Sequence, residues 1–387
     1  MTDLSIKGYE VSPSRGFLCQ YDADSIKLPS DFDVVVEVAE ALPKLVPTGR
    51  VRSHIDQLPV LDLTEFCLHA SDAQIRSLMV RYTFLIQVYV WGEADVVDTL
   101  PECLAKPCWQ LSQHTKQPPL LTYSNYVLDN WAKINPEGPI SLDNIYMIQP
   151  FIGGQDEAWF VLIHVAIEAS AGKMLIDFPK ISNAAVNHDL DTIHAGLANI
   201  ATTWKDLNAI FDRMPERCDP YVYFNRVRPW IHGWKDNPAL PNGVTYTGVE
   251  DNRALNYRGQ TGSQSSIVPA VDALFGINHA DDPLRHFLDE LHSYRPVPHQ
   301  QFISDLRANS VLRQTITDAG EPQLIELYNQ CLDGLAQFRS KHLEYAASYI
   351  AKQNQHSGGN STDVGTGGTP FMRYLRKHRD EVNQHKL

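Results

Sequence analysis

The hydrophobic residues of this chain recur mostly three or four positions apart, the spacing that aligns side chains on one face of a helix. Residues 189–213 show this spacing throughout, from Leu190 to Phe211, and residues 72–92 show it as well. Residues 158–171 are apolar nearly all round, which predicts a buried helix. Shorter helices are expected over residues 33–41, 263–275, 283–294 and 371–379.

The longest predicted helix extends from Pro322 to about Gln353. Its hydrophobic face alternates steps of four and three residues without interruption: Leu324, Tyr328, Cys331, Leu335, Phe338, His342, Tyr345 and Tyr349. The two-residue alternation that marks strands is scarce, and no long internal repeat is present. The pattern therefore predicts an all-α fold.

Breaks in this pattern divide the chain. Residues 106–121 contain three prolines and are expected to form a connection. The glycine pair 153–154 predicts a junction between a small N-terminal domain, residues 1–152, and a large helical domain, residues 153–387. Within the large domain, the Ser/Gly/Thr-rich stretch 356–369 is expected to be a mobile loop.

Composition narrows the class of protein. Across 387 residues, 46 Asp and Glu outnumber 33 Lys and Arg, and the net charge of -13 disfavours nucleic-acid binding. The most apolar stretch, 158–172, is interrupted by His164 and Glu168, so no membrane span is expected. The N-terminus lacks an apolar leader, and none of the six cysteines forms a CxxC pair. These features predict a soluble cytoplasmic protein with reduced thiols, with neither a membrane nor a nucleic acid as partner.

His342 is the first candidate for chemistry, because it lies on the hydrophobic face of the longest helix, between Phe338 and Tyr345. A buried imidazole needs partners for its ring nitrogens, and ligation of haem iron is one way to supply them. A core histidine bonded to a backbone carbonyl or a tyrosine satisfies the same need. The spacing alone favours this second interpretation.

His164 and Glu168 lie one turn apart on the predicted buried helix. Pairing at this spacing would raise the pKa of the histidine. Two side chains are too few to hold a metal by themselves. We therefore expect a hydrogen-bonded pair of His164 and Glu168.

Arg228 directly precedes Pro229, which is expected to move it out of the helical backbone region. Tyr223 and Trp230 are close in sequence. The arginine would either clamp a ligand carboxylate through two hydrogen bonds or cover aromatic surface. The local sequence favours a surface arginine.

Two segments rich in small residues, 259–266 and 365–369, offer backbone N–H groups to an anion. The second lacks the lysine of a nucleotide-binding loop, and the serines of the first lack a GxSxG frame. Nucleotide binding and serine hydrolysis are therefore disfavoured.

Short motifs along residues 75–375 together resemble the indoleamine 2,3-dioxygenase family, haem enzymes that open the indole ring of tryptophan. The motifs occur in the order of the family: YVWG at 89–92, QLS at 110–112, PPLLTY at 118–123, VLDNW at 127–131, GWKDNP at 233–238, GSQSS at 262–266, FRSKHL at 338–343 and GTGGT at 365–369. Each motif is short, but their ordered conjunction is specific.

The resemblance implies a haem b group between two helical domains, with residues 1–152 covering its distal side. His342 matches the proximal iron ligand of the family, and Arg339 matches an arginine near a haem propionate. Ser263 and Asp272 are further cofactor-binding residues on this basis. The implied substrate pocket comprises Tyr123, Tyr126, Val127, Phe160, Tyr223, Ile231 and Gly262.

The same resemblance assigns Arg228 to the substrate carboxylate and Thr366 to a loop that closes over the amino-acid end. His164 stands where animal enzymes of the family have a serine and where the related tryptophan 2,3-dioxygenases have a histidine. Tyr223 replaces a distal phenylalanine, and Tyr126 replaces a small residue. These larger, more polar walls favour L-tryptophan over a broad range of indoleamines.

The implied reaction inserts O2 across the indole C2–C3 bond of L-tryptophan and gives N-formylkynurenine. Arg228 would fix the carboxylate, His164 would hydrogen-bond the indole N–H, and an unidentified one-electron reductant would keep the iron ferrous. Three alternatives stay open: another haem enzyme that transforms tryptophan or a substituted tryptophan, a non-catalytic haem protein that binds O2, and a haem-free helical scaffold.

Overall fold

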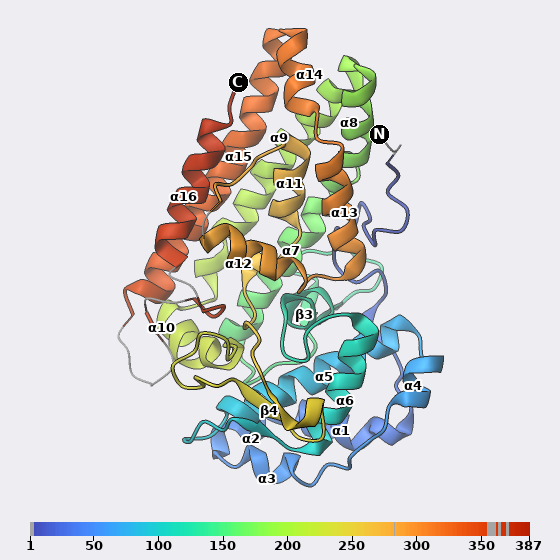
Figure 1. The fold of residues 1–387 in the computed structure, drawn as a ribbon, viewed down its shortest axis with the longest axis vertical. Helices are drawn as coiled ribbons and strands as arrows, with labels where there is room; N and C mark the ends of the chain where they lie inside the picture. The colour runs from blue at the N-terminus through green and yellow to red at the C-terminus, as the bar shows by residue number, and fades with distance from the viewer. Residues whose placement is uncertain (1–3, 282, 354–360, 363–364, 369–370) are drawn as a thin grey trace.

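The computed structural model describes the whole chain apart from residues 1–3, 282, 354–360, 363–364 and 369–370. Helices dominate the fold (Figure 1), which confirms the predicted all-α class. The α-helices are Asp33–Glu40 (α1), Leu42–Leu45 (α2), Val51–Ile55 (α3), Thr64–His69 (α4), Asp72–Trp91 (α5), Glu102–Thr115 (α6), Gln155–Leu175 (α7), Phe178–Asn187 (α8), Leu190–Asp212 (α9), Pro220–Val222 (α10), Ile267–Phe275 (α11), Pro283–His292 (α12), Val297–Ala308 (α13), Leu312–Ala319 (α14), Pro322–Ala346 (α15) and Phe371–Gln384 (α16). The strands are Thr99–Leu100 (β1), Trp131–Lys133 (β2), Ile145–Met147 (β3), Val244–Tyr246 (β4) and Ala254–Leu255 (β5).

Four long helices, α7, α9, α15 and α16, lie lengthwise beside one another in one half of the molecule (Figure 1). α9 packs against both α7 and α15, and α16 packs along α15. The hydrophobic face predicted for α15 is used along its whole length. Its first half is buried, including Tyr328 and Leu335, whereas His342 and Tyr345 near its end line a cavity.

The N-terminal helices α1 to α6 gather at the opposite end of the molecule (Figure 1). α5 is central there: it begins with a capping box between Ser71 and Gln74 and packs against α1 and α6. Two contacts join segments that are far apart in the sequence, one through β4 and one through Leu4. β4 pairs in parallel with β1 and antiparallel with β5, and Leu4 exchanges two hydrogen bonds with the side chain of Asn183 in α8.

The prediction that residues 106–121 form a connection is wrong for their first half, because α6 continues through Pro107. A proline inside a helix removes one hydrogen bond and costs about 3 kcal/mol. Here Leu104 and Leu111 on the same helix are fully buried, and we attribute the persistence of the helix to that burial. The chain leaves α6 only at Lys116, which adopts a left-handed conformation with φ 58°.

Three π-helical turns occur in the described chain: Ser124–Leu128, Tyr223–Val227 and Ala347–Ala351. The last one continues α15 almost to the predicted end of that helix. Such turns are rare in proteins overall, and those that occur are often found at functional sites. The first carries Tyr126 and the second begins at Tyr223, both of which were predicted for the substrate pocket.

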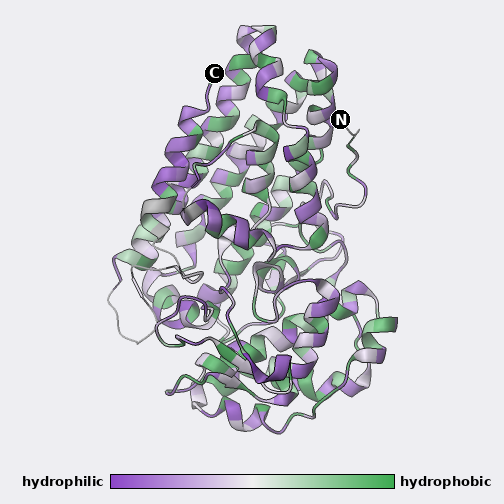
Figure 2. Cartoon of the chain, in the orientation of Figure 1, coloured by the Kyte–Doolittle hydropathy of each residue, from purple (hydrophilic) through white to green (hydrophobic). Residues whose placement is uncertain are grey.

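By length and hydropathy alone, the stretch Gln155–Asn187 would be able to cross a membrane, with a mean hydropathy of 1.5. In the fold it comprises α7 and α8, and 72% of its most apolar window is buried inside the protein. Hydrophobic residues concentrate on the inner helices, whereas α16 at the edge is largely hydrophilic (Figure 2). The apolar character of α7 is therefore that of a core helix.

Candidate functional site

A cavity lies where α7, the end of α15 and the segment 259–266 meet. It consists of two adjoining hollows that share several lining residues. Both hollows are lined by His164, Phe211, Gly262, Ser263, His342 and Leu375. The first hollow is also lined by Phe160, Tyr223, Ile231 and Thr366, and the second by Tyr123, Asp272 and Arg339. Most of the predicted site residues therefore surround one cavity.

His342 reaches this cavity from α15 and lines both hollows. Within the described part of the chain, neither of its ring nitrogens forms a hydrogen bond to the protein. Burial lowers the pKa of His342 to about 4, and the nearby His164 adds to this shift. The imidazole is thus neutral at pH 7, with the nitrogen lone pair that a metal ligand requires. A neutral imidazole that faces a cavity in this way fits the ligation of haem iron.

Arg339 and Asp272 form an ion pair in the wall of the second hollow. The Nη2 atom of Arg339 lies 3.0 and 2.8 Å from the two carboxylate oxygens, and each side chain is 7% exposed. Burial by itself would raise the pKa of Asp272, but the charge of Arg339 and a hydrogen bond with His279 outweigh it and lower the pKa to about 2. This wall is therefore polar. Arg339 lies on α15 with His342, and Asp272 lies on α11.

His164 projects from α7 into the same cavity. Its Nδ1 atom lies 2.7 Å from the carbonyl oxygen of Phe160, one turn back in the helix. A carbonyl can only accept, so Nδ1 carries the proton and Nε2 is left as an acceptor. The predicted hydrogen bond between His164 and Glu168 is wrong, because the Nδ1–H group of His164 donates to the Phe160 carbonyl instead. The predicted rise in the pKa of His164 is wrong as well, since burial lowers that pKa.

Glu168 instead anchors two residues of the cavity wall. Its Oε1 atom accepts a hydrogen bond from the Ser265 hydroxyl at 2.7 Å and one from the Tyr123 hydroxyl at 3.0 Å. Complete burial raises the pKa of Glu168 to about 7, and the two hydrogen bonds only partly oppose that rise. The sequence pattern places Glu168 on a buried face, but it cannot identify partners that are about 45 and 97 residues away.

Replacing Glu168 with glutamine is expected to flatten the pH dependence of stability. A folded pKa of about 7 against an ordinary value of 4.5 means that the folded state binds this proton more tightly. The protonated carboxyl group therefore contributes fully to the free energy of unfolding below about pH 4.5. This contribution, at most roughly 3 kcal/mol, is lost as the pH rises to about 7. Glutamine carries no charge at any pH and still accepts both hydrogen bonds.

Urea unfolding at several pH values between 5 and 8 measures this difference. Glu326→Gln is the matched control, because Glu326 is exposed on α15. If the Glu168→Gln variant loses stability with rising pH as steeply as the original chain, the buried carboxyl group does not titrate as expected.

Arg228 is fully buried, so the prediction of a surface arginine is wrong. Its backbone also stays helical, with φ -56° and ψ -35°, contrary to the expected effect of Pro229. The π-helical turn Tyr223–Val227 runs directly into a short 3-10 turn, whose first positions accept a proline. Burial lowers the pKa of Arg228 to about 10, against an opposing effect of Tyr223. The guanidinium group lies 5.5 Å from the centre of the Phe224 ring.

Three predicted site residues do not line the cavity in the described structure: Tyr126, Val127 and Arg228. All three are buried. The ring of Tyr126 lies 6.4 Å from the ring of Phe160, and Arg228 interacts electrostatically with Tyr223. Tyr126 and Arg228 therefore influence the cavity through the aromatic side chains of Phe160 and Tyr223.

The loop predicted over residues 356–369 lies largely outside the described residues, so its mobility stays a prediction. Its described part covers the first hollow. The hydroxyl of Thr366 donates a hydrogen bond to the carbonyl of Gln260 at 2.5 Å, and Arg258 donates one to the carbonyl of Gly367 at 2.7 Å. These contacts place Thr366 at the cavity.

Sequence reasoning missed several aromatic residues of the first hollow. Phe211 lies on α9, and Tyr345 and Tyr349 lie on α15 and the π-helical turn after it. The helical spacing had placed each of them on a hydrophobic face. That signal does not separate a side chain packed in the core from one that lines a cavity.

The comparisons agree with the geometry. Residues 5–385 match the protein family described as indoleamine 2,3-dioxygenase. The chain is 32% identical to indoleamine 2,3-dioxygenase 1 of Rattus norvegicus and 31% identical to indoleamine 2,3-dioxygenase 2 of Homo sapiens, covering 98% of this chain and 95% of each relative. It is also 27% identical to a myoglobin of Haliotis madaka over 99% of both chains. Because the family match spans almost the whole chain, this protein belongs to the indoleamine 2,3-dioxygenase family.

Proposed function

We propose that this chain uses a haem b group, held by His342, to insert O2 across the indole C2–C3 bond of L-tryptophan and form N-formylkynurenine. Membership of the family supports a haem-dependent tryptophan or indoleamine dioxygenase. The observation that carries the finer proposal is the meeting of His342 and His164 in one cavity. One of these histidines is suited to bind iron, and the other is suited to accept a hydrogen bond from a substrate.

Haem, when bound, supplies the iron that activates O2. His342 would hold it from α15. Ser263, Asp272 and Arg339 line the second hollow and would accommodate its propionates, because this wall is polar and includes a guanidinium group. An external one-electron reductant would return the iron to its ferrous form.

The first hollow would hold the substrate. Phe160, Tyr223 and Ile231 present apolar surface to an indole ring. Arg228, buried behind Tyr223, would bind the carboxylate once the tyrosine shifts aside. Thr366 would close over the amino-acid end and help to exclude water. Tyr123 and Gly262 line the second hollow and would complete the substrate wall on that side. The buried Tyr126 and Val127 would support this wall.

The Nε2 atom of His164 would accept a hydrogen bond from the indole N–H, because the Nδ1–H group of His164 already donates to the Phe160 carbonyl. We therefore expect His164→Ser to relax discrimination against a methyl group on the indole nitrogen. The ratio of kcat/KM values for 1-methyltryptophan and L-tryptophan should rise by about tenfold, the effect of one lost neutral hydrogen bond. Steady-state kinetics with both substrates measures the ratio.

His194→Ala is the control for this prediction, since His194 is exposed on α9. An unchanged ratio in His164→Ser would show that the indole nitrogen does not contact residue 164. The haem absorbance of each variant must match that of the original chain, so that a loss of cofactor is not read as a change of specificity.

The reaction itself is tested by reducing the haem-loaded protein without oxygen and then adding O2 and L-tryptophan. We expect N-formylkynurenine by its absorbance and mass, with both oxygen atoms of labelled O2 retained. A product whose indole ring is rearranged without uptake of both atoms would instead indicate another haem enzyme that acts on tryptophan.

The match to a myoglobin favours a second candidate function, reversible O2 binding without turnover. This function would require His342 but would not require the buried charge of Arg228. A long-lived oxygen complex that is unaffected by L-tryptophan would support it. Decay of that complex in step with product formation would support the dioxygenase.

The organisation of the chain follows from the same proposal. Residues 1–152 would form the small domain over the distal side of the haem, and residues 153–387 would supply the proximal ligand and the closing loop. The cytoplasm would be its location, because its thiols are free and five of the six are buried.

A further inference from the structure

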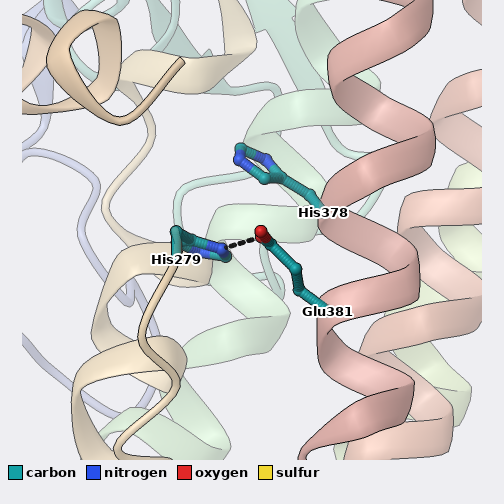
Figure 3. Close-up of side chains that lie close together, drawn as sticks. All are labelled: His279, His378 and Glu381. Atoms are coloured by element: carbon teal, nitrogen blue, oxygen red, sulfur yellow. Dashed lines mark hydrogen bonds and ion pairs between the residues drawn. The ribbon is translucent and has the colours of Figure 1, made fainter. Parts of the chain in front are cut away.

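Three potential metal ligands meet beside the second hollow. His378 and Glu381 lie three positions apart on α16, which places them on one face of the helix. His279 faces them from the segment between α11 and α12 (Figure 3). One ligand atom from each residue lies within 4.8 Å of the others. The Nδ1 atom of His279 is already 2.5 Å from a carboxylate oxygen of Glu381.

The far side of His279 is oriented by a second carboxylate. Its Nε2 atom lies 3.2 Å from Asp272, which in turn is held by Arg339. Histidines that bind metals almost always donate their other ring N–H to a carboxylate or a carbonyl, and this fixes the ring and makes the ligating nitrogen more basic. His279 already has this arrangement, with Nδ1 directed at the cluster.

His378 supplies the second imidazole. Its ring centre lies 4.4 Å from that of His279, and its buried Nε2 atom has no hydrogen-bond partner among the described residues. Burial lowers the pKa of His378 to about 3, with the charge of Arg339 adding to the shift. A neutral buried nitrogen without a partner is costly, and a metal ion would satisfy it.

We propose that His279, His378 and Glu381 form a binding site for a divalent metal ion of the zinc class, separate from the haem ligand. Two histidines, one glutamate and a water are a common tetrahedral zinc set. Bond lengths of about 2.0–2.2 Å require ligand atoms roughly 3.3 Å apart, so the widest pair would close by roughly 1.5 Å. That closure is within reach of side-chain rotation on one helix and one loop.

A metal at this site would fasten α16 to the segment that follows α11. α16 comes shortly after the segment 365–368, which covers the first hollow, and His279 and His378 line the second. The ion would therefore brace one wall of the cofactor cavity and the base of the closing loop. It would act on the architecture of the site and would not touch the reacting atoms.

Equilibrium dialysis of the haem-loaded protein against micromolar Zn2+, followed by metal analysis, tests the proposal. We expect one tightly bound zinc per chain. His378→Gln and Glu381→Gln should each weaken zinc binding by at least about tenfold. Glu381 is not among the residues that line the second hollow, so Glu381→Gln should leave the haem absorbance unchanged. His279→Gln should weaken zinc binding to a similar extent, and a rise in Tm on adding Zn2+ should disappear in all three variants.

His286→Gln is the matched control, because His286 is an exposed histidine on the adjacent α12. The control matters because the chain has 15 histidines that offer adventitious zinc sites. Zinc binding that is equal in the three ligand variants and in this control would overturn the proposal. So would binding by the haem-free chain that vanishes on haem loading, which would assign these imidazoles to the edge of the haem.

Discussion

Replacing His342 with alanine is expected to abolish haem retention. This imidazole faces the cavity, it is neutral because burial lowers its pKa to about 4, and within the described residues it has no hydrogen bond to the protein. Losing an outer-shell partner of a metal ligand typically costs 10–100-fold in affinity, and losing the ligand itself should cost more. The Soret absorbance after haem reconstitution and gel filtration measures the loss.

The same variant offers a rescue. Alanine leaves a space the size of an imidazole ring, so added imidazole should restore part of the haem absorbance by entering it. His194→Ala, an exposed histidine on α9, should retain haem fully. A normal Soret band in His342→Ala without added imidazole would show that another residue binds the iron. Circular dichroism at the same concentration separates loss of haem from loss of the fold.

Helical periodicity was enough to predict most of the fold. The spacing of apolar residues located α5, α7, α9 and α15 within a few residues, because each of these helices buries a continuous face. It was wrong at α6, where proline content suggested a break. A helix can contain a proline such as Pro107 when enough of its surface is buried. That balance depends on tertiary packing, which local sequence does not contain.

The candidate site was harder to predict from residues alone. Periodicity placed His342 and His164 on buried faces, but it favoured core roles for both. Only the ordered motifs of the family pointed to a shared cavity. The partners of His164 and Glu168 were wrongly predicted because the two side chains are neighbours in sequence. His164 instead hydrogen-bonds a backbone carbonyl one turn away, and Glu168 accepts hydrogen bonds from hydroxyl groups that are distant in sequence.

The burial of Arg228 was also wrongly predicted from its neighbours in the sequence. Its sequence neighbours suggested a residue on the surface, whereas the fold buries it completely between π-helical and 3-10 turns. A buried guanidinium group is costly to dehydrate, which is why burial lowers the pKa of Arg228 to about 10. It stays charged at pH 7 in spite of this cost. Such a charge is well suited to a ligand carboxylate that enters the apolar cavity beside it.

We therefore expect Arg228→Leu to lower kcat/KM for L-tryptophan by a factor of about 30 to several thousand. This range corresponds to the 2–5 kcal/mol lost when one member of a buried charge pair is truncated. Leucine fills much of the space and removes the charge, so haem absorbance should not change. Steady-state turnover of L-tryptophan is the measurement, with Arg226→Ala as control, because Arg226 is exposed on the same turn.

The substrate provides the decisive comparison. Tryptamine has the indole ring and the amine of tryptophan but lacks the carboxylate, so it cannot form the proposed ion pair. If Arg228 binds the carboxylate, the variant should lose far less activity toward tryptamine than toward L-tryptophan, and the two substrates should become similar. Equal losses for both would mean that Arg228 supports the wall behind Tyr223 and does not contact the ligand. The ratio of the two losses therefore separates charge recognition from packing, even if the variant is somewhat less stable.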